Sequence, residues 1–457
     1  MKNQIFLLIL TELIVLCFSN PLPAQEERSS ENGIGWGGYL QTDDRMRLKG
    51  NGNFYWQEYR LDLRAEVSPA EKAHFYSEIW LRSWGLPDVE NHYDLTDKTK
   101  VAPLDLDIRE AYIDLYEFLS GNIDIRIGRQ RIAWGTADKL NPTDNINPYD
   151  LEDIWDFGRH LGSDGLKASC YIGNYIFSVA YIPVFTPAVL PRGDWLYALM
   201  PPIGLPPGFR LGTLTNTVIL PENNPKDGST AGVKISKNFF DYDFSLSYVY
   251  GRDGLPMAKK AVISATGVPR ELDIASELIY PKMQTAGVDM AGSVANVGVW
   301  AEAAVFFPEK VKTTADLSAL GMGVQEFTAL DNKPYIKYVA GGDYTFKNGI
   351  YLNGQYLHGF IHERGAENLE DYIMLVIDWK LLNDKLKIPL IGMGAEIKDF
   401  EDIKNNYALI LLPEITYYPI SNAEINLGGR WIEGKNTTAF GRVKDYDELY
   451  LKVKYSF

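Results

Sequence analysis

Apolar and polar side chains alternate one by one along much of this chain, and this period of two constrains the fold more than any other feature. Such alternation predicts β-strands with two different faces. In segment 54–67 the polar face carries acids and bases in turn, which favours a water-filled barrel interior over a soluble sandwich. Its apolar face holds Tyr59, Leu61, Leu63, Ala65 and Val67, and its polar face holds Glu58, Arg60, Asp62, Arg64 and Glu66.

Similar segments recur to the C-terminus, joined alternately by tight and mostly longer connections. If both chain ends lie in the periplasm, the tight connections are periplasmic and the longer ones extracellular, as in bacterial outer-membrane barrels. We therefore expect residues 25–457 to form one all-β domain, an antiparallel up-and-down transmembrane β-barrel of about 18 strands with long extracellular loops, 16 strands being the alternative. The expected strands are 34–44, 54–67, 73–85, 104–117, 122–134, 164–172, 175–183, 229–239, 242–251, 283–291, 296–307, 334–345, 350–361, 369–380, 386–398, 406–418, 423–432 and 446–457.

Composition removes several other classes of protein. Hydrophobic residues make up 46% of the chain, which is too many for a disordered protein. A net charge of −15 argues against a nucleic-acid partner. No apolar run long enough for a membrane-spanning helix follows the N-terminus.

Residues 1–24 resemble a secretory signal peptide, with Lys2 before a mainly apolar stretch and Ala24 at the expected cleavage site. Cys17 raises a lipoprotein alternative, but the preceding Leu16 is bulky where a lipobox requires a small residue. Cleavage would leave Cys170 as the single cysteine, which excludes an intrachain disulfide and a thiolate metal cluster. We expect no metal and no cofactor.

The last strand ends the chain on an aromatic residue. It resembles the strand by which Gram-negative outer-membrane barrels are recognised by their insertion machinery, although a soluble barrel can also close with such a strand. This resemblance implies the cell outer membrane, with its lipid and lipopolysaccharide, as the location. The apolar positions are Leu449, Leu451, Val453, Tyr455 and Phe457.

A second resemblance rests on residues 125–150. Arg-x-Gly-Arg-Gln at 126–130, Trp134-Gly135 and two Asn-Pro-x-Asp turns at 141–144 and 147–150 resemble a segment of proteobacterial porins and alginate-export-type channels. The resemblance implies a channel without naming its solute. Alternation breaks at Gly128, where either a bulge turns Arg129 or Arg131 toward the lumen or these residues lie at the membrane interface.

The carboxylates that follow allow two readings. Asp144, Asp150, Asp153 and Asp156 offer hard oxygen ligands for calcium, but their spacing lacks the regular pattern of an EF-hand loop. We favour successive turns built by Asn-Pro and Asp.

The connection 184–228 is long, proline-rich and apolar. It either folds into the lumen as a constriction, with Trp195, Tyr197 and Phe209 as the narrowing residues, or packs among the extracellular loops. Two further long connections contain possible short helices at 270–280 and 313–320.

Enzyme motifs are absent from the sequence. His358 and His362 are four apart, but an extended strand would separate them by about 13 Å. Neither a Gly-x-Ser-x-Gly elbow nor a His-Glu-x-x-His helix occurs, so we do not expect an enzyme.

The leading hypothesis is a porin-like channel for passive or facilitated passage of small polar or amphipathic solutes, including carbohydrate-like ones. Trp80 and Trp300 on the lumen side add to this interpretation. The alternative is a scaffold or surface-binding barrel with a plugged lumen, and the oligomeric state stays open. The candidate lumen residues are Arg60, Asp62, Arg64, Glu66, Glu78, Arg82, Glu110, Asp114, Asp124, Arg126, Glu302 and Arg430.

Overall fold

The computed structural model describes residues 33–50, 52–200 and 205–457. The expected signal peptide, residues 1–24, lies outside the described residues. Within them, no helix is long and apolar enough to cross a membrane. Short helical turns occur only in connections: η1 (Asp94–Thr96), α2 (Lys98–Val101), η2 (Gly193–Trp195), α3 (Leu196–Leu199), η3 (Ser318–Leu320), η4 (Ala366–Asn368), η5 (Ile403–Asn405) and η6 (Phe440–Val443).

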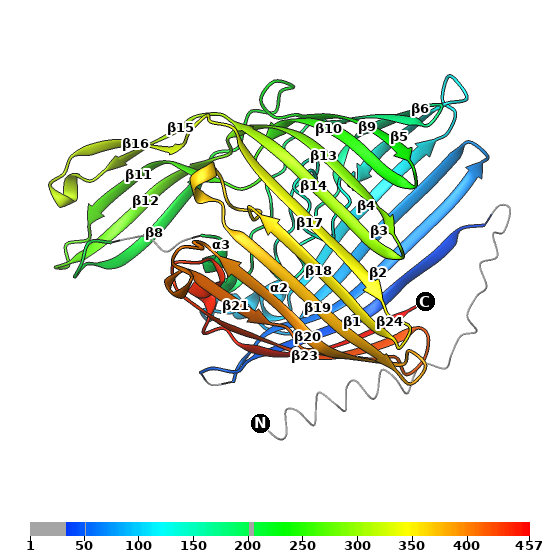
Figure 1. Ribbon diagram of the computed structural model, residues 1–457. Coiled ribbons are helices and arrows are strands. Elements are labelled where there is room, and N and C mark those ends of the chain that lie inside the picture. Colours follow the sequence, from blue (N-terminus) through cyan, green and yellow to red (C-terminus); the bar gives the residue numbers. More distant parts are fainter. Residues whose placement is uncertain (1–32, 51, 201–204) are drawn as a thin grey trace.

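The main sheet is a closed antiparallel barrel (Figure 1). Neighbouring strands in the chain pair with each other, and the last strand pairs back onto the first with Tyr39 opposite Ser456. The wall strands are β1 (Gly35–Arg47), β2 (Phe54–Ala70), β3 (Ala73–Trp84), β4 (Leu104–Leu115), β5 (Ile123–Gln130), β6 (Ser163–Ile172), β7 (Tyr175–Ile182), β9 (Thr230–Phe239), β10 (Tyr242–Arg252), β13 (Lys282–Val294), β14 (Val297–Pro308), β17 (Tyr335–Thr345), β18 (Ile350–His358), β19 (Asp371–Leu381), β20 (Leu386–Ile397), β21 (Tyr407–Leu411), β22 (Glu414–Tyr417), β23 (Ala423–Gly434) and β24 (Glu448–Ser456).

The pieces β21 and β22 occupy one position in the wall, because both pair with β20 and β23. Pro413 lies between them and has no N–H to donate, while its carbonyl accepts a 3.0 Å hydrogen bond from the Gly429 amide. With these two pieces counted as one, the barrel has 18 strands. The predicted fold and strand count are confirmed, and every expected strand segment contains a wall strand.

The outer face of the barrel is apolar and exposed. In β10, the outward side chains Phe244, Leu246 and Tyr248 are 39%, 62% and 40% exposed, whereas Ser245 and Val249 on the other face are buried. The alternation that predicts the strands therefore separates an apolar exterior from a mainly polar interior.

Five further strands form a second sheet, in the order β16-β15-β11-β12-β8. It extends beyond the barrel at the end away from the C-terminus (Figure 1). Its members are β8 (Arg210–Val218), β11 (Met257–Ala265), β12 (Glu271–Ile279), β15 (Val311–Asp316) and β16 (Val324–Leu330).

The helices expected at 270–280 and 313–320 are wrong. These segments form β12 and β15, with only the turn η3 at the end of the second. In β12, Leu272 and Ile274 are buried between Glu271, Asp273 and Ala275, which is a period of two rather than a helical period.

A hydrophobic core fills part of the barrel mouth. It joins residues of five connections to inward side chains of β17, β18, β19, β21 and β23. Its buried members include Leu151, Ile154, Trp195, Phe360, Phe440 and Val443. This side of the mouth is therefore packed like a protein interior.

Candidate functional site

The connection between β5 and β6, residues 131–162, crosses the barrel interior, and we call it the lumen segment. On one side of the barrel, the backbone carbonyl of Asp138 accepts a 3.2 Å hydrogen bond from the Gln355 side chain on β18. On the other side, Asp153 contacts β1 and Glu152 contacts β3. The lumen segment thus bridges strands on opposite sides of the ring.

Glu302 on β14 anchors the tip of the lumen segment. Its carboxylate is buried and accepts hydrogen bonds from the amides of Thr136 (2.5 Å) and Ala137 (2.6 Å). It also accepts from the Asn141 side chain at 2.9 Å and from the Thr143 hydroxyl at 2.8 Å. Hydrogen bonds to a charged acceptor are stronger than those between neutral groups. One wall residue therefore fixes the position of residues 136–143, which we call the tip.

Asp153 holds the middle of the lumen segment against β1. Arg45 is 1% exposed, and its guanidinium donates to both oxygens of Asp153, at 2.8 and 2.5 Å, and to Asp43 at 2.6 Å. Burial alone would raise the pKa of Asp153, but the Arg45 charge outweighs it and holds this pKa well below its usual value. Asp153 therefore stays ionised.

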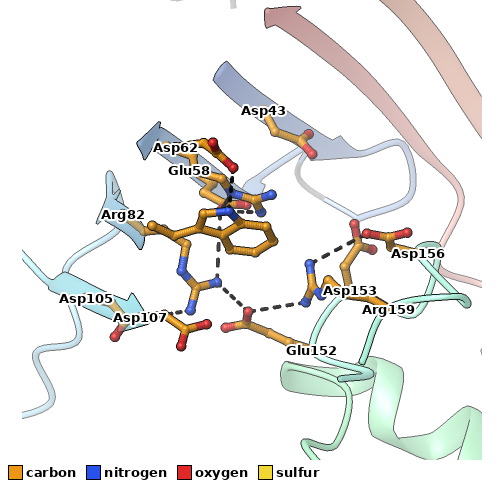
Figure 2. Close-up of polar contacts among 12 residues, drawn as sticks. Asp43, Glu58, Asp62, Arg82, Asp105, Asp107, Glu152, Asp153, Asp156 and Arg159 are labelled. Carbon is orange, nitrogen blue, oxygen red and sulfur yellow. Dashed lines mark hydrogen bonds and ion pairs between the residues drawn. The ribbon is translucent and has the colours of Figure 1, made fainter. Parts of the chain in front are cut away.

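A second group of ion pairs joins the lumen segment to β3 and β4. Glu152 lies between Arg82 (2.5 Å) and Arg159 (3.5 Å), as Figure 2 shows. Asp150 accepts hydrogen bonds from Arg159 and from Arg109 on β4, at 3.0 and 2.9 Å. These ion pairs act together with the apolar packing of Leu151 and Ile154 to hold the segment across the lumen.

Trp80 on β3 lies between two of the guanidinium groups. The centres of the Arg60 and Arg109 guanidinium groups are 4.0 and 4.3 Å from its ring centroid, and its indole N–H donates to Asp62 at 2.8 Å. Stacking of this kind fixes the cations in orientation as well as in position.

A bulge in β4 explains why Arg109 faces inward. Glu78 pairs with Glu110, but the next pair is Ile79 with Ile108, so Arg109 is an extra residue. Arg109 and Glu110 consequently both project into the interior. Our sequence analysis missed Arg109, although the outward residues Leu104, Leu106 and Ile108 are followed by Ala111 and Ile113, a spacing that marks the extra residue.

Two cavities remain beside the lumen segment. The larger, which we call the vestibule, has a volume of about 790 Å³ and lies against β1, β2, β3, β4 and β24. The smaller, of about 100 Å³, lies between residues 140–149 and the far ends of β7 to β18. Asn141 lines both, so it lies at the boundary between them.

Arg60, Glu78 and Glu110 are the predicted lumen residues that line the vestibule. Asp62 and Arg82 are buried beside it and bind Trp80 and Glu152. Glu302 and Arg430 contact the lumen segment, since the Arg430 guanidinium lies 4.8 Å from the Trp155 ring. Vestibule residues that we did not predict include Asp43, Arg109, Lys139, Arg159 and Lys452.

The remaining predicted lumen residues lie toward the tight turns. Arg64 pairs with Asp62 at 2.9 Å, and Arg126 pairs with Asp114 at 2.7 Å. Glu66 is exposed, and Asp124 accepts a 3.0 Å hydrogen bond from the Glu117 amide. These five acidic and basic side chains belong to wall networks away from the lumen segment.

Of the two alternatives at Gly128, the bulge is not found. The pairing of β5 with β6 runs without a register shift from Ile123 to Gln130. Gly128 has φ +126°, and a Cβ there would lie 2.4 Å from the Ala111 carbonyl oxygen, so close approach to β4 requires the glycine. Arg129 stays on the outer face in an exposed ion pair with Asp164, whereas Arg131, beyond the strand end, binds Asp144 inside.

The described part of the connection 184–228 packs on the lumen segment and reaches β1, where the Arg47 guanidinium lies 4.5 Å from the Trp195 ring. Val189 pairs with the lumen segment through Tyr149 and Leu151, and Trp195 packs on Trp155 with ring centroids 5.1 Å apart. Val184, Phe185 and Thr186 line the smaller cavity. Residues 201–204 lie outside the described part.

The three expected constriction residues lie in different surroundings, and Trp195 is buried in the hydrophobic core of the mouth. Tyr197 is 50% exposed, and Phe209 directly precedes β8 of the second sheet. The lumen segment, which we did not predict to cross the interior, does so because Glu152 and Asp153 pair with the wall residues Arg82 and Arg45.

The carboxylates that resembled calcium ligands form ion pairs with arginines. Asp144 pairs with Arg131, Asp150 with Arg109 and Arg159, and Asp153 with Arg45. Burial lowers the pKa of His160, and its Nδ1 lies 3.1 Å from both the Arg131 guanidinium and the Gly158 carbonyl. His358 binds Asp371 at 2.8 Å.

The C-terminal strand β24 closes the barrel. Glu448, Tyr450 and Lys452 face the interior, which places Leu449, Leu451, Val453 and Tyr455 on the opposite face. The Phe457 backbone exchanges two 3.1 Å hydrogen bonds with Gly38 on β1.

No family model and no curated protein matches this chain. Among solved structures, it is similar to Pseudomonas aeruginosa OccK9 (OpdG), with 10% identity, a TM-score of 0.49, and coverage of 93% of this chain and 97% of that one. It is also similar to Salmonella typhi OmpF in complex with daunomycin, with 10% identity, a TM-score of 0.42, and coverage of 93% and 98%. A third is Vibrio cholerae OmpT, with 9% identity, a TM-score of 0.40, and coverage of 95% and 100%. The 18-stranded barrel rests on the strand pairing of this chain, not on these similarities.

Proposed function

We propose that this protein is a porin-like channel of the bacterial outer membrane, for passive or facilitated passage of small polar solutes. The observation that carries the proposal is the vestibule, a polar cavity inside a closed barrel, bordered by a segment held across the lumen. A polar interior and an internal constriction are what a selective pore requires.

The outer-membrane location is supported by the exterior of the barrel. Large apolar side chains are exposed on its outer face, among them Leu246 at 62% and Leu106 at 66%. Lipid and lipopolysaccharide would cover such a surface, and the terminal strand would serve recognition by the insertion machinery. The segment 125–150, which resembles porins and alginate-export-type channels, adds to the proposal.

Reconstitution in planar bilayers tests the channel. We expect discrete conductance steps that a mock preparation from cells lacking the protein does not give. Absence of steps above the mock level, with folding verified by circular dichroism, would sink the proposal.

A scaffold with a plugged lumen is the second candidate, and the hydrophobic core in the mouth favours it. A plugged barrel predicts that neither ions nor small solutes pass. Liposome swelling in a small neutral solute therefore separates the two candidates.

A further inference from the structure

We infer that the vestibule selects uncharged, polyhydroxylated solutes of carbohydrate type over ions of similar size. The inference rests on the proposed channel function and names its substrate class. It is drawn from the balance and pairing of the charges that line the cavity.

The vestibule is lined by as many acidic as basic side chains, so it carries no net charge. The net charge of −15 of the whole chain therefore lies outside this lining. The basic residues are Arg60, Arg109, Arg131, Lys139, Arg159 and Lys452, and the acidic residues are Asp43, Glu78, Glu110, Asp144, Asp153 and Asp156.

Most of these charges already have a partner within the protein. Arg60 pairs with Glu58 at 2.6 Å, Arg109 with Asp150 at 2.9 Å and Lys452 with Asp43 at 3.4 Å. An ion that enters must lose part of its hydration shell. A side chain that is already in an ion pair attracts the ion too weakly to offset this loss. The vestibule therefore offers no strong site for either sign of ion.

Paired charges still bind hydroxyl groups. A guanidinium has five N–H donors, and a carboxylate accepts about four hydrogen bonds, so one ion pair leaves donors and acceptors unused. A sugar hydroxyl can use either kind. The Tyr39 and Trp155 rings at the same cavity add apolar surface for the C–H faces of a sugar ring.

The size of the vestibule agrees with this class of solute. About 790 Å³ falls within the range of roughly 300–1,000 Å³ that is usual for small-molecule sites. A monosaccharide therefore fits with part of its water shell.

The first test uses the full-length protein in bilayers and liposomes. We expect a reversal potential near zero in a KCl gradient. We also expect faster swelling with a neutral hexose than with the corresponding uronate or amino sugar. Strong preference for cations or anions, or faster passage of either charged sugar, would overturn the inference while leaving the channel in place. Absence of both conductance and swelling would instead remove the proposed function.

The second test disturbs the charge balance in opposite directions. Glu78→Gln removes one negative charge from the vestibule and should shift the reversal potential toward anions. Lys452→Gln removes one positive charge and should shift it toward cations. Lys312→Gln, in β15 of the second sheet, is the matched control and should leave it unchanged. Equal reversal potentials in all three variants and the wild type would contradict a vestibule tuned to neutrality.

Discussion

The Asn141 side chain donates a 2.9 Å hydrogen bond to Glu302 at the boundary between the two cavities of the barrel interior. Glu302 belongs to the wall and Asn141 to the lumen segment, so this contact joins the segment to the wall. Because Glu302 also holds Thr136, Ala137 and Thr143, the tip of the segment depends on one carboxylate.

Replacing Glu302 should therefore widen the pore. Glu302→Ala leaves several buried donors without an acceptor, and each one costs about 1–3 kcal/mol of stability. The tip avoids this cost only by moving so that water solvates these donors. We expect a larger and noisier single-channel conductance than in the wild type. Glu302→Gln, which keeps one acceptor oxygen, should give an intermediate value. A Glu302→Ala channel indistinguishable from the wild type would show that the tip does not limit conduction.

Loss of the Asp153 carboxylate should destabilise the barrel. Asp153→Asn leaves the buried Arg45 with one anionic partner instead of two, and disrupting a buried ion pair costs roughly 3 kcal/mol. Since the folded pKa of Asp153 is depressed, the wild type should keep this contribution above the unfolded value of 3.8 and lose it as pH falls toward the folded pKa. Thermal unfolding in detergent, followed by circular dichroism, measures both effects. A melting temperature that Asp153→Asn leaves unchanged at neutral pH would contradict this assignment.

Arginine on the outer face should be costly only if that face meets lipid. Leu246→Arg places a charge on the exposed apolar face of β10. Near the bilayer midplane, such a charge destabilises the folded barrel by about 2–4 kcal/mol. Ser247→Arg, the next residue, faces the interior and should cost less. The two variants are compared by folding yield into liposomes. Equal yields would argue against a lipid-facing exterior.

His362 should make the barrel mouth sensitive to acid. Burial, followed by the nearby Lys337 and Arg364 charges, lowers the pKa of His362 to about 3 from 6.5. Because the unfolded chain binds this proton more tightly, stability should be full above pH 6.5 and fall as pH drops toward 3. His362→Asn should flatten the slope of melting temperature against pH in that window. An unchanged slope would place the acid sensitivity elsewhere.

The wall of the barrel was predictable because each strand carries its own signal. A period of two is a local property, and a lipid-facing side chain must be apolar whatever its neighbours are, so Leu246 can be assigned an outward position from the sequence. The same reasoning placed Arg60, Glu78 and Glu110 inside. The alternation is interrupted between Ile108 and Ala111, so the bulge that turns Arg109 inward was also predictable, although we missed it.

The identity of the segment that crosses the lumen was not predictable in this way. Connections have no period, and the apolar, proline-rich stretch 184–228 was a reasonable candidate on composition. What selects 131–162 is the meeting of its carboxylates with arginines from distant strands, such as Asp153 with Arg45, 108 positions away in the chain. Likewise, the acceptor for the tip, Glu302, is 166 positions from Thr136.

By itself, then, the sequence determined an 18-stranded antiparallel barrel with an apolar exterior and charged interior, since strand alternation is local and the solvent on each side dictates its face. The tertiary structure alone decided which connection enters the lumen, which charges neutralise one another and where the vestibule remains. Those outcomes depend on contacts that form only when the ring closes and brings β1, β4 and β14 around one interior.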